Sequence, residues 1–194
     1  MTNPIARLLA HFHSDGPNNW RDIEYFNRKW KIRIRKMSGF IEPGSSVVDL
    51  GCGRMWLKNY LPQAIKYFPV DYKYRGADCI VQDFNQQQYP DVDADTAFVS
   101  GCLEYIDDPR WFVSEICRNQ TMCVLSYCTT EYFPDEVIRM KKAWVNSLSE
   151  TQVISLFNDF GFDLTHKTHE KTYVIFVFRK PVPENRIDKS QIQP

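Results

Sequence analysis

The apolar residues of this chain recur in two patterns that predict alternating strands and helices. Short runs rich in Val, Ile and Phe, bounded by turn-forming residues, predict strands, whereas apolar residues three and four positions apart predict helices. The predicted strands are 47–50, 65–70, 79–81, 96–99, 122–127, 162–168 and 172–179, and the predicted helices are 21–37, 56–61, 109–117, 134–144 and 149–160. Strands that alternate with helices favour an α/β fold with a mostly parallel sheet.

A glycine turn follows the first predicted strand, in the stretch Val-Val-Asp-Leu-Gly-Cys-Gly. Gly51 and Gly53 suit a sharp turn where the backbone approaches a ligand closely. A dinucleotide fingerprint would need a third glycine at the position of Trp56, so NAD-type binding is disfavoured. Asp49 places a carboxylate near the turn, which repels phosphate and accepts hydrogen bonds from an ammonium group. The turn therefore favours a cationic or zwitterionic ligand.

Two further acidic residues follow predicted strands. Asp71 lies 20 positions after Gly51 (71 − 51), the spacing at which a strand-end carboxylate can accept hydrogen bonds from ribose hydroxyls. Asp83 follows the third strand and precedes Phe84, a pair that suits adenine, because the acid can accept from an amine and the ring offers apolar contact. These residues predict a nucleoside site at the carboxyl edge of the sheet.

With Asp49, Gly51 and Gly53 in an acid-x-Gly-x-Gly pattern, the chain resembles the class I S-adenosylmethionine-dependent methyltransferases over residues from about 40 to 180. The resemblance implies a Rossmann-like, seven-stranded, mostly parallel sheet with helices on both faces and an antiparallel last strand. It also implies S-adenosylmethionine as cofactor. The family often carries a third glycine where this chain has Met55. The expected cofactor-binding residues are Asp49, Gly51, Cys52, Gly53, Asp71, Tyr72, Asp83, Phe84, Ser100 and Gly101.

The domain organisation follows from the resemblance and from the length, since 194 residues are near the size of one domain. Residues 1–40 are expected to form an N-terminal helical cap, residues 41–180 the S-adenosylmethionine-binding methyltransferase domain, and residues 181–194 a flexible tail.

Three residues are candidates for catalysis. In the family, the segment after the fourth strand lies beside the transferable methyl group, and here it reads Leu-Glu-Tyr where related small-molecule enzymes have Leu-Glu-His. Glu104 and Tyr105 are therefore candidates, although a phenol with a pKa of about 10 is a poorer base than imidazole. His13 is the third, because the N-terminal segment often folds over the acceptor in this family.

The acceptor is expected to be a small molecule, with a hydroxyl preferred. Tyr127, Glu131 and Tyr132 follow or end the fifth strand, where rings and carboxylates could orient a polyhydroxylated compound such as a sugar or another cell-surface or secondary metabolite. Two alternatives stay open. One is a binding or regulatory protein that keeps the fold without transferring a methyl group. The other is an RNA or protein methyltransferase that uses the basic face of the helix at 21–37, which carries Arg28, Lys29, Lys31, Arg33, Arg35 and Lys36.

The charge balance, the apolar runs and the cysteine spacing limit the partners and ligands that we expect for this protein. The chain has 24 Lys and Arg against 24 Asp and Glu, so no long-range field favours nucleic acid or an anionic membrane. No charged-then-apolar leader and no bilayer-length apolar run occur, so a cytoplasmic protein is expected. No metal site is expected: the six cysteines lack ligand spacing, and Asp107-Asp108 before Pro109 suits a helix cap. The sequence does not indicate an oligomeric state.

Overall fold

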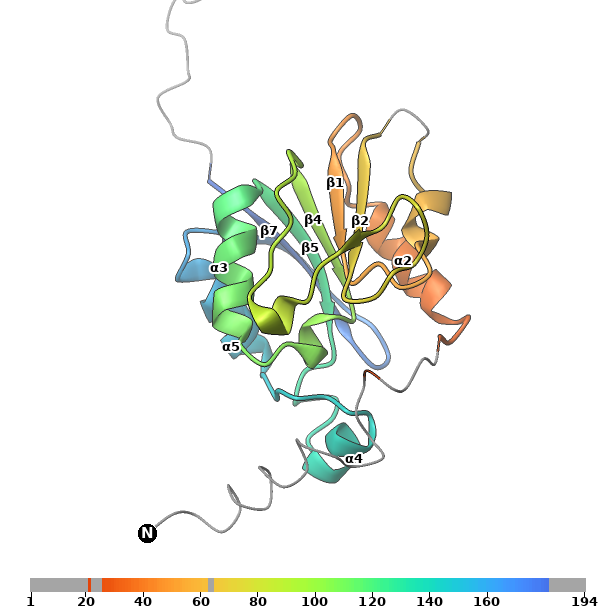
Figure 1. The fold of residues 1–194 in the computed structure, drawn as a ribbon. Coiled ribbons are helices and arrows are strands. Elements are labelled where there is room, and N and C mark those ends of the chain that lie inside the picture. The colour runs from red at the N-terminus through yellow and green to blue at the C-terminus, as the bar shows by residue number, and fades with distance from the viewer. Residues whose placement is uncertain (1–20, 22–25, 63–64, 182–194) are drawn as a thin grey trace, which may run out of the picture.

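The computed structural model describes residues 21, 26–62 and 65–181, and these form a seven-stranded sheet between two layers of helices (Figure 1). The strand order is β3-β2-β1-β4-β5-β7-β6. The strands are β1 (Val47–Leu50), β2 (Tyr67–Asp71), β3 (Ile80–Val81), β4 (Thr96–Ser100), β5 (Met122–Tyr127), β6 (Asp163–His169) and β7 (Val174–Arg179). Every predicted strand is present; β1 and β5 have the predicted ends, and the other five are shifted at one or both ends.

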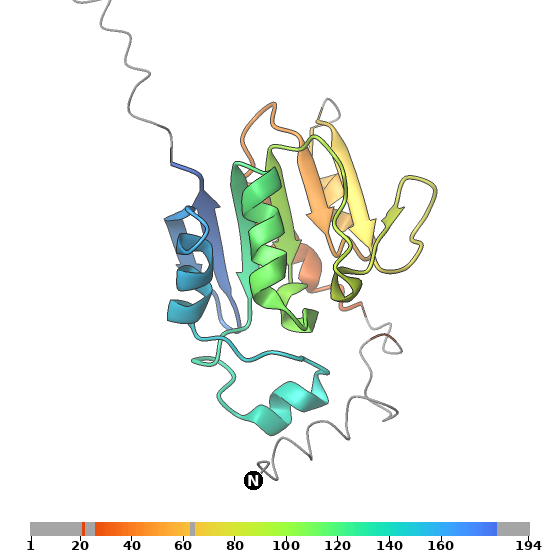
Figure 2. The ribbon, with the colours of Figure 1, turned by 60° about the vertical axis from the view of Figure 1, so that its left-hand side comes forward.

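The sheet is parallel except at β7, which pairs antiparallel with both β5 and β6. The Rossmann-like class I fold with an antiparallel last strand is therefore confirmed. The parallel strands β3, β2, β1 and β4 all end at one edge of the sheet. Figure 2 shows α4 (Glu136–Lys141) beyond that edge. Parallel α/β sheets bind ligands at the carboxyl ends of their strands, so this edge positions the candidate site.

One face of the sheet is covered by α3 (Pro109–Asn119) and α5 (Glu150–Asn158) (Figure 2). Phe112 and Val113 of α3, and Val153 and Phe157 of α5, are buried in the core on that face. Both helices begin at a side-chain cap: Asp108 accepts from the Trp111 amide at 3.0 Å, which confirms the predicted cap before Pro109. At the start of α5, Ser149 and Gln152 form a capping box.

The other face is covered by α2 (Trp30–Ser38) and the 3₁₀ helix η1 (Trp56–Asn59). Met37 and Leu57 are their buried residues. The prediction that the first helix begins at Arg21 is wrong, because residues 26–29 are not helical. The Asn27 side chain accepts a hydrogen bond from the Lys29 amide at 2.9 Å, a local turn that competes with a helix and precedes α2. Residues 1–20 and 182–194, predicted as part of the cap and the tail, lie outside the described residues.

Candidate active site

The strand ends present a row of residues on the face that α2 covers. Register pairs Leu50 with Val70, and one step further Gly51 lies beside Asp71. On the other side of β1, Asp49 pairs with Phe98, so Ser100 lies level with Gly51. Neighbouring residues of parallel strands point to the same face, and α2 therefore covers the side of the edge on which Asp71 and Ser100 project.

The glycine turn is tightly packed. Gly51 has φ +81° and Gly53 has φ +52°, values that side chains rarely adopt. A Cβ on Gly51 would lie 2.6 Å from the Cys102 Sγ, and one on Gly53 would lie 2.6 Å from the ring of Phe26. The turn therefore requires glycine at both positions. The Cys102 thiol, which follows β4, and the Phe26 ring, which precedes α2, occupy the space beside it.

Asp71 and Asp83 accept hydrogen bonds at the ends of β2 and β3. Asp71 accepts from the Gly53 amide at 2.9 Å, which connects the second strand to the glycine turn, and it forms an ion pair with Arg75 at 3.2 Å. Asp83 forms an ion pair with Arg21 at 2.7 Å. Both acids are at least nine-tenths buried, and both already have a guanidinium partner. A ligand at either carboxylate would compete with an arginine.

Asp49 does not share this arrangement. Its carboxylate is 4% exposed and accepts a hydrogen bond from the Tyr67 phenol at 2.6 Å. Burial raises the pKa of Asp49 to about 7; the Tyr67 hydrogen bond lowers it, and the charge of Asp71 raises it further. Asp49 is therefore an interior group directed at Tyr67 and close to Asp71.

Three other predicted cofactor residues have partly internal roles. Phe84 is 6% exposed and packs on Phe112 with ring centroids 5.0 Å apart, so little of its ring is open to a ligand. Cys52 is buried, with its Sγ 3.9 Å from that of Cys79. The Tyr72 phenol donates to the Arg21 carbonyl at 3.1 Å.

Arg33 of α2 is bound at the end of β4. Its guanidinium donates to the Ser100 Oγ at 3.0 Å and to the Ser100 carbonyl at 3.2 Å, and it lies over Gly101, where a Cβ would come within 2.6 Å of it. It lies over the rings of Trp30 and Tyr173, each at 5.6 Å. No carboxylate of the described residues forms an ion pair with Arg33. A cation without a fixed anion thus lies beside the strand edge.

Aromatic and basic side chains surround Phe26. Its ring is met edge-on by Trp30 and Trp56, both with centroids 6.2 Å away. The guanidinium groups of Arg54 and Arg75 lie over the Phe26 ring at 5.2 and 5.3 Å. Cation–π contacts of this kind hold the ring on the glycine turn.

Glu104 lies in the 3₁₀ helix η3 (Leu103–Tyr105), after β4, and is 2% exposed. Its Oε1 accepts from the Cys128 amide at 3.0 Å, while its Oε2 is buried without a hydrogen-bond partner among the described residues. Burial raises the pKa of Glu104, and the charge of Arg33 acts in the opposite direction. A buried carboxylate with one unsatisfied oxygen can accept a proton or a hydrogen bond from a ligand.

Tyr105 is less suited to proton removal. Burial, followed by the charge of Glu104, raises the pKa of Tyr105 to about 12, so the phenol stays protonated near neutrality. His13, the third catalytic candidate, lies outside the described residues.

Arg33 and Phe26 were not predicted as site residues. Arg33 was grouped with the basic face of the first helix, yet it follows Trp30 by three positions and precedes Met37 by four. That spacing places it on the apolar side of α2, and an arginine at such a position was the available signal. Phe26 falls within the predicted helix 21–37, and no pattern in the sequence indicates that it lies outside the helix, on Gly53.

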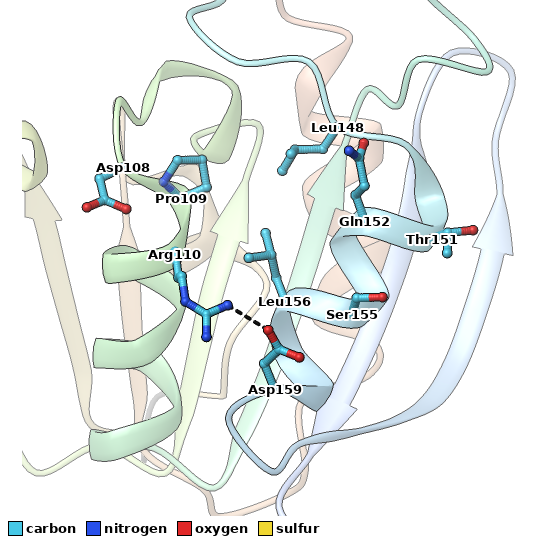
Figure 3. A pocket seen from close by; sticks show the side chains of 9 residues that line it. All are labelled: Asp108, Pro109, Arg110, Leu148, Thr151, Gln152, Ser155, Leu156 and Asp159. Carbon is cyan, nitrogen blue, oxygen red and sulfur yellow. Dashed lines mark hydrogen bonds and ion pairs between the residues drawn. The ribbon is translucent and has the colours of Figure 1, made fainter.

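A separate groove of about 350 Å³ lies between α3 and α5, away from these residues (Figure 3). Leu148 and Leu156 line it together with an ion pair of Arg110 and Asp159 at 2.6 Å. None of the predicted site residues that the structure describes contributes to it. The strand edge, and not this groove, carries the buried carboxylates.

Within the described part of the chain, no three His, Cys, Asp or Glu side chains are grouped to hold a metal ion. No helix among these residues is long and apolar enough to span a bilayer.

The model of a methyltransferase domain family matches residues 20–167, so the chain belongs to that family. It is an S-adenosylmethionine-dependent methyltransferase, as the resemblance predicted, and S-adenosylmethionine is its cofactor. No curated protein matches the sequence.

Solved structures of methyltransferases share the fold at low identity. One is from Haloferax volcanii, in a complex with the Trm112 methyltransferase activator, with TM-score 0.65, 15% identity, and 80% of this chain and 91% of that chain covered. Another is magnesium protoporphyrin IX methyltransferase from Synechocystis PCC 6803 with bound S-adenosylhomocysteine, with TM-score 0.61, 15% identity, and 91% and 100% covered. A third is mitomycin 7-O-methyltransferase, with TM-score 0.61, 14% identity, and 78% and 54% covered.

Proposed function

We propose that this methyltransferase acts on a hydroxyl group of a small molecule and that Glu104 receives the hydroxyl proton. The observation that carries the proposal is the unsatisfied Oε2 of Glu104, buried just after β4. A raised pKa makes this carboxylate a better base near neutrality than an exposed one, because proton transfer is most effective when the pKa of the base is near the working pH.

The residues at the strand edge fit the cofactor. Asp71 would accept from the ribose hydroxyls and Asp83 from the adenine amine, in each case in exchange for an arginine that now pairs with the acid. Arg33 would bind the carboxylate of the methionine end, because it is a guanidinium beside Ser100 that pairs with no carboxylate of the described residues. Phe26 covers Gly53, so its ring must move aside when the cofactor reaches the turn.

Methyl transfer to a hydroxyl needs no reactant besides the cofactor, the acceptor and a base. The cofactor supplies a methyl group on a positively charged sulfur, so the carbon–sulfur bond breaks as a carbon–oxygen bond to the acceptor forms. Glu104 takes the proton that the hydroxyl loses. The products are S-adenosylhomocysteine, a methyl ether and a protonated Glu104, which returns its proton to solvent. Positioning of the two reactants supplies much of the rate in such a transfer.

The small-molecule acceptor is supported by the structural neighbours that act on compounds of this kind, such as mitomycin 7-O-methyltransferase. The Haloferax volcanii neighbour, in complex with an activator of methyltransferases, keeps an RNA or protein acceptor as the second candidate. The basic residues of α2 give little support to an RNA or protein acceptor, because Arg33 is bound to Ser100 and Lys36 pairs with Glu170 at 2.7 Å.

The test uses cofactor with a radioactive methyl group, incubated with the protein and a cell extract. We expect label in the low-molecular-weight fraction, as an alkali-stable ether, and a loss of about a hundredfold or more in Glu104→Gln. Glu115→Gln is the matched control, since Glu115 pairs with Arg118 on α3. Label confined to RNA or protein would contradict the small-molecule proposal, and full activity of Glu104→Gln would contradict the role of Glu104.

A further inference from the structure

The segment that carries Glu104 is held in place by one side chain from the loop after α4. Asn146 donates through its Nδ2 to the carbonyls of Leu103 and Ile106, at 2.6 and 2.9 Å. These two carbonyls lie on either side of Glu104 and Tyr105. The backbone amide of Val145 adds a third bond, to the Glu104 carbonyl at 2.9 Å. Two successive residues of one loop thus hold the whole of η3.

The orientation of Asn146 is itself determined by Tyr127, the last residue of β5. The Tyr127 phenol donates to the Asn146 Oδ1 at 2.6 Å and accepts from the Leu148 amide at 3.0 Å. Tyr127 is completely buried. With its oxygen bound to Tyr127 and its nitrogen to two carbonyls, the Asn146 amide has its partners satisfied in one orientation only.

Arg139 of α4 completes the arrangement. It is 2% exposed and lies over the Trp144 ring at 4.9 Å. Its guanidinium donates to five oxygens: the Tyr127 phenol, the Ser147 hydroxyl, and the carbonyls of Cys128, Phe133 and Asn146. Among the described residues no carboxylate pairs with it.

Without a carboxylate partner among the described residues, the desolvation of this buried guanidinium is offset by its hydrogen bonds and by its contact with the Trp144 ring. Those hydrogen bonds connect α4 to the end of β5 and to the loop that carries Asn146. The end of β5 also fixes the Glu104 side chain, because the Cys128 amide donates to its Oε1 and the Cys128 carbonyl accepts from Arg139. The backbone and the carboxylate of Glu104 are thus held by one connected set of hydrogen bonds.

We propose that Asn146 is a positioning residue for methyl transfer, oriented by Tyr127 and Arg139, and that it holds the Glu104 carboxylate dry and aimed at the acceptor. The proposal rests on the role of Glu104 in the proposed function. It adds that α4 and its loop act on the reaction through η3, without a contact to the cofactor-binding acids.

The test compares Asn146→Ala and Tyr127→Phe with the wild type by NMR. The Cys128 amide bonds to the Glu104 carboxylate, so its chemical shift against pH reports the ionisation of Glu104. We expect the pKa of Glu104 to fall toward its ordinary value in both variants, as water reaches the loosened segment. We also expect hydrogen exchange at residues 103–106 to quicken about tenfold, the effect of one or two lost hydrogen bonds.

Asn119→Ala is the matched control, because Asn119 also donates to a backbone carbonyl, that of Glu115 at 2.9 Å, but at the end of α3. If the pKa of Glu104 in both variants equals its pKa in Asn119→Ala, the proposal is overturned, whether or not hydrogen exchange at residues 103–106 becomes faster. If Asn146→Ala does not fold, Tyr127→Phe alone tests the proposal, because this variant keeps the buried ring. Calorimetry with S-adenosylhomocysteine on the wild type keeps the two proposals separate, since a failure to bind counts against the proposed function and not against the positioning of Glu104.

Discussion

The phenol of Tyr67 donates a 2.6 Å hydrogen bond to the carboxylate of Asp49, inside the sheet and next to the glycine turn. The pair lies on neighbouring strands, β1 and β2, on the face that α2 covers. Despite this bond, burial raises the pKa of Asp49 from 3.8 to about 7. The folded protein therefore retains a proton that the unfolded chain would release near pH 4.

This proton predicts how stability changes with pH. Between about pH 4 and pH 7 the folded state binds more protons at Asp49 than the unfolded state, so the Asp49 contribution to the free energy of unfolding falls as pH rises. Asp49→Asn removes the titration and can still accept from Tyr67. We expect the variant to match the wild type at pH 4 and to exceed it at pH 8 by up to about 4 kcal/mol, measured by urea denaturation.

Asp95→Asn is a control, because the contribution of Asp95 to the free energy of unfolding changes with pH in the opposite direction. Hydrogen bonds from the Ser46 hydroxyl and amide lower the pKa of Asp95, so its contribution is present at neutral pH and is lost as pH falls through the lowered pKa. Asp95→Asn should be less stable than the wild type at pH 7, and the difference should shrink in acid. Parallel stability curves for Asp49→Asn and the wild type would mean that Asp49 is ionised in the folded protein.

Gly51 and Gly44 offer a matched pair for the glycine turn. Both have left-handed backbones, with φ +81° and +84°, but a Cβ on Gly44 would meet nothing within 4 Å, whereas one on Gly51 would meet Cys102 at 2.6 Å. We expect Gly44→Ala to cost about 1 kcal/mol from backbone strain. Gly51→Ala should cost about 2 kcal/mol more from overpacking, by urea denaturation. Equal losses would show that Cys102 moves freely away from the turn.

The order of the elements could be predicted from the sequence because strand and helix periods differ. The run Met122–Tyr127 was predicted with both ends as observed, since a fully buried strand that is apolar at all but one position has clear borders. The first helix was predicted too long, because Ile23 and Phe26 continue the helical spacing while Asn27 turns the chain before Trp30. Periodicity reports which residues are apolar, but not where a local side-chain hydrogen bond interrupts a helix.

The site was predictable only as far as strand ends determine it. Asp71 and Asp83 follow their strands, so their place at the carboxyl edge could be predicted, but the arginines that pair with them could not. Arg21 lies 62 positions before Asp83 (83 − 21), and such distant contacts leave no periodic signal. Asn146 was read as part of a connecting stretch for the same reason, because its partners lie about 40 positions away.

Phe26 should control access of the cofactor to the glycine turn. Because its ring covers Gly53, a ligand that needs the turn binds only the fraction of molecules in which the ring has moved, and its apparent affinity falls accordingly. We expect Phe26→Ala to bind S-adenosylhomocysteine about three- to tenfold more tightly by calorimetry. Phe40→Ala, whose ring contacts His166, is the control and should bind as the wild type does. Weaker binding by Phe26→Ala would instead make the ring a wall of the cofactor site.

Arg33 can be tested with two ligands that differ at the methionine end. S-adenosylhomocysteine has an amino-acid carboxylate, and 5′-methylthioadenosine lacks it. If Arg33 binds that carboxylate, Arg33→Met should weaken S-adenosylhomocysteine by about ten- to a hundredfold, the value of a charged hydrogen bond, and leave 5′-methylthioadenosine unchanged.

Arg35→Met, on the exposed side of α2, controls for the change in net charge. An equal loss for both ligands in Arg33→Met would mean that Arg33 only holds α2 against Ser100, through the bonds to its hydroxyl and carbonyl. A selective loss for S-adenosylhomocysteine requires a direct contact with the carboxylate. It would place the methionine end of the cofactor at the end of β4, beside Gly101 and within reach of the segment that carries Glu104.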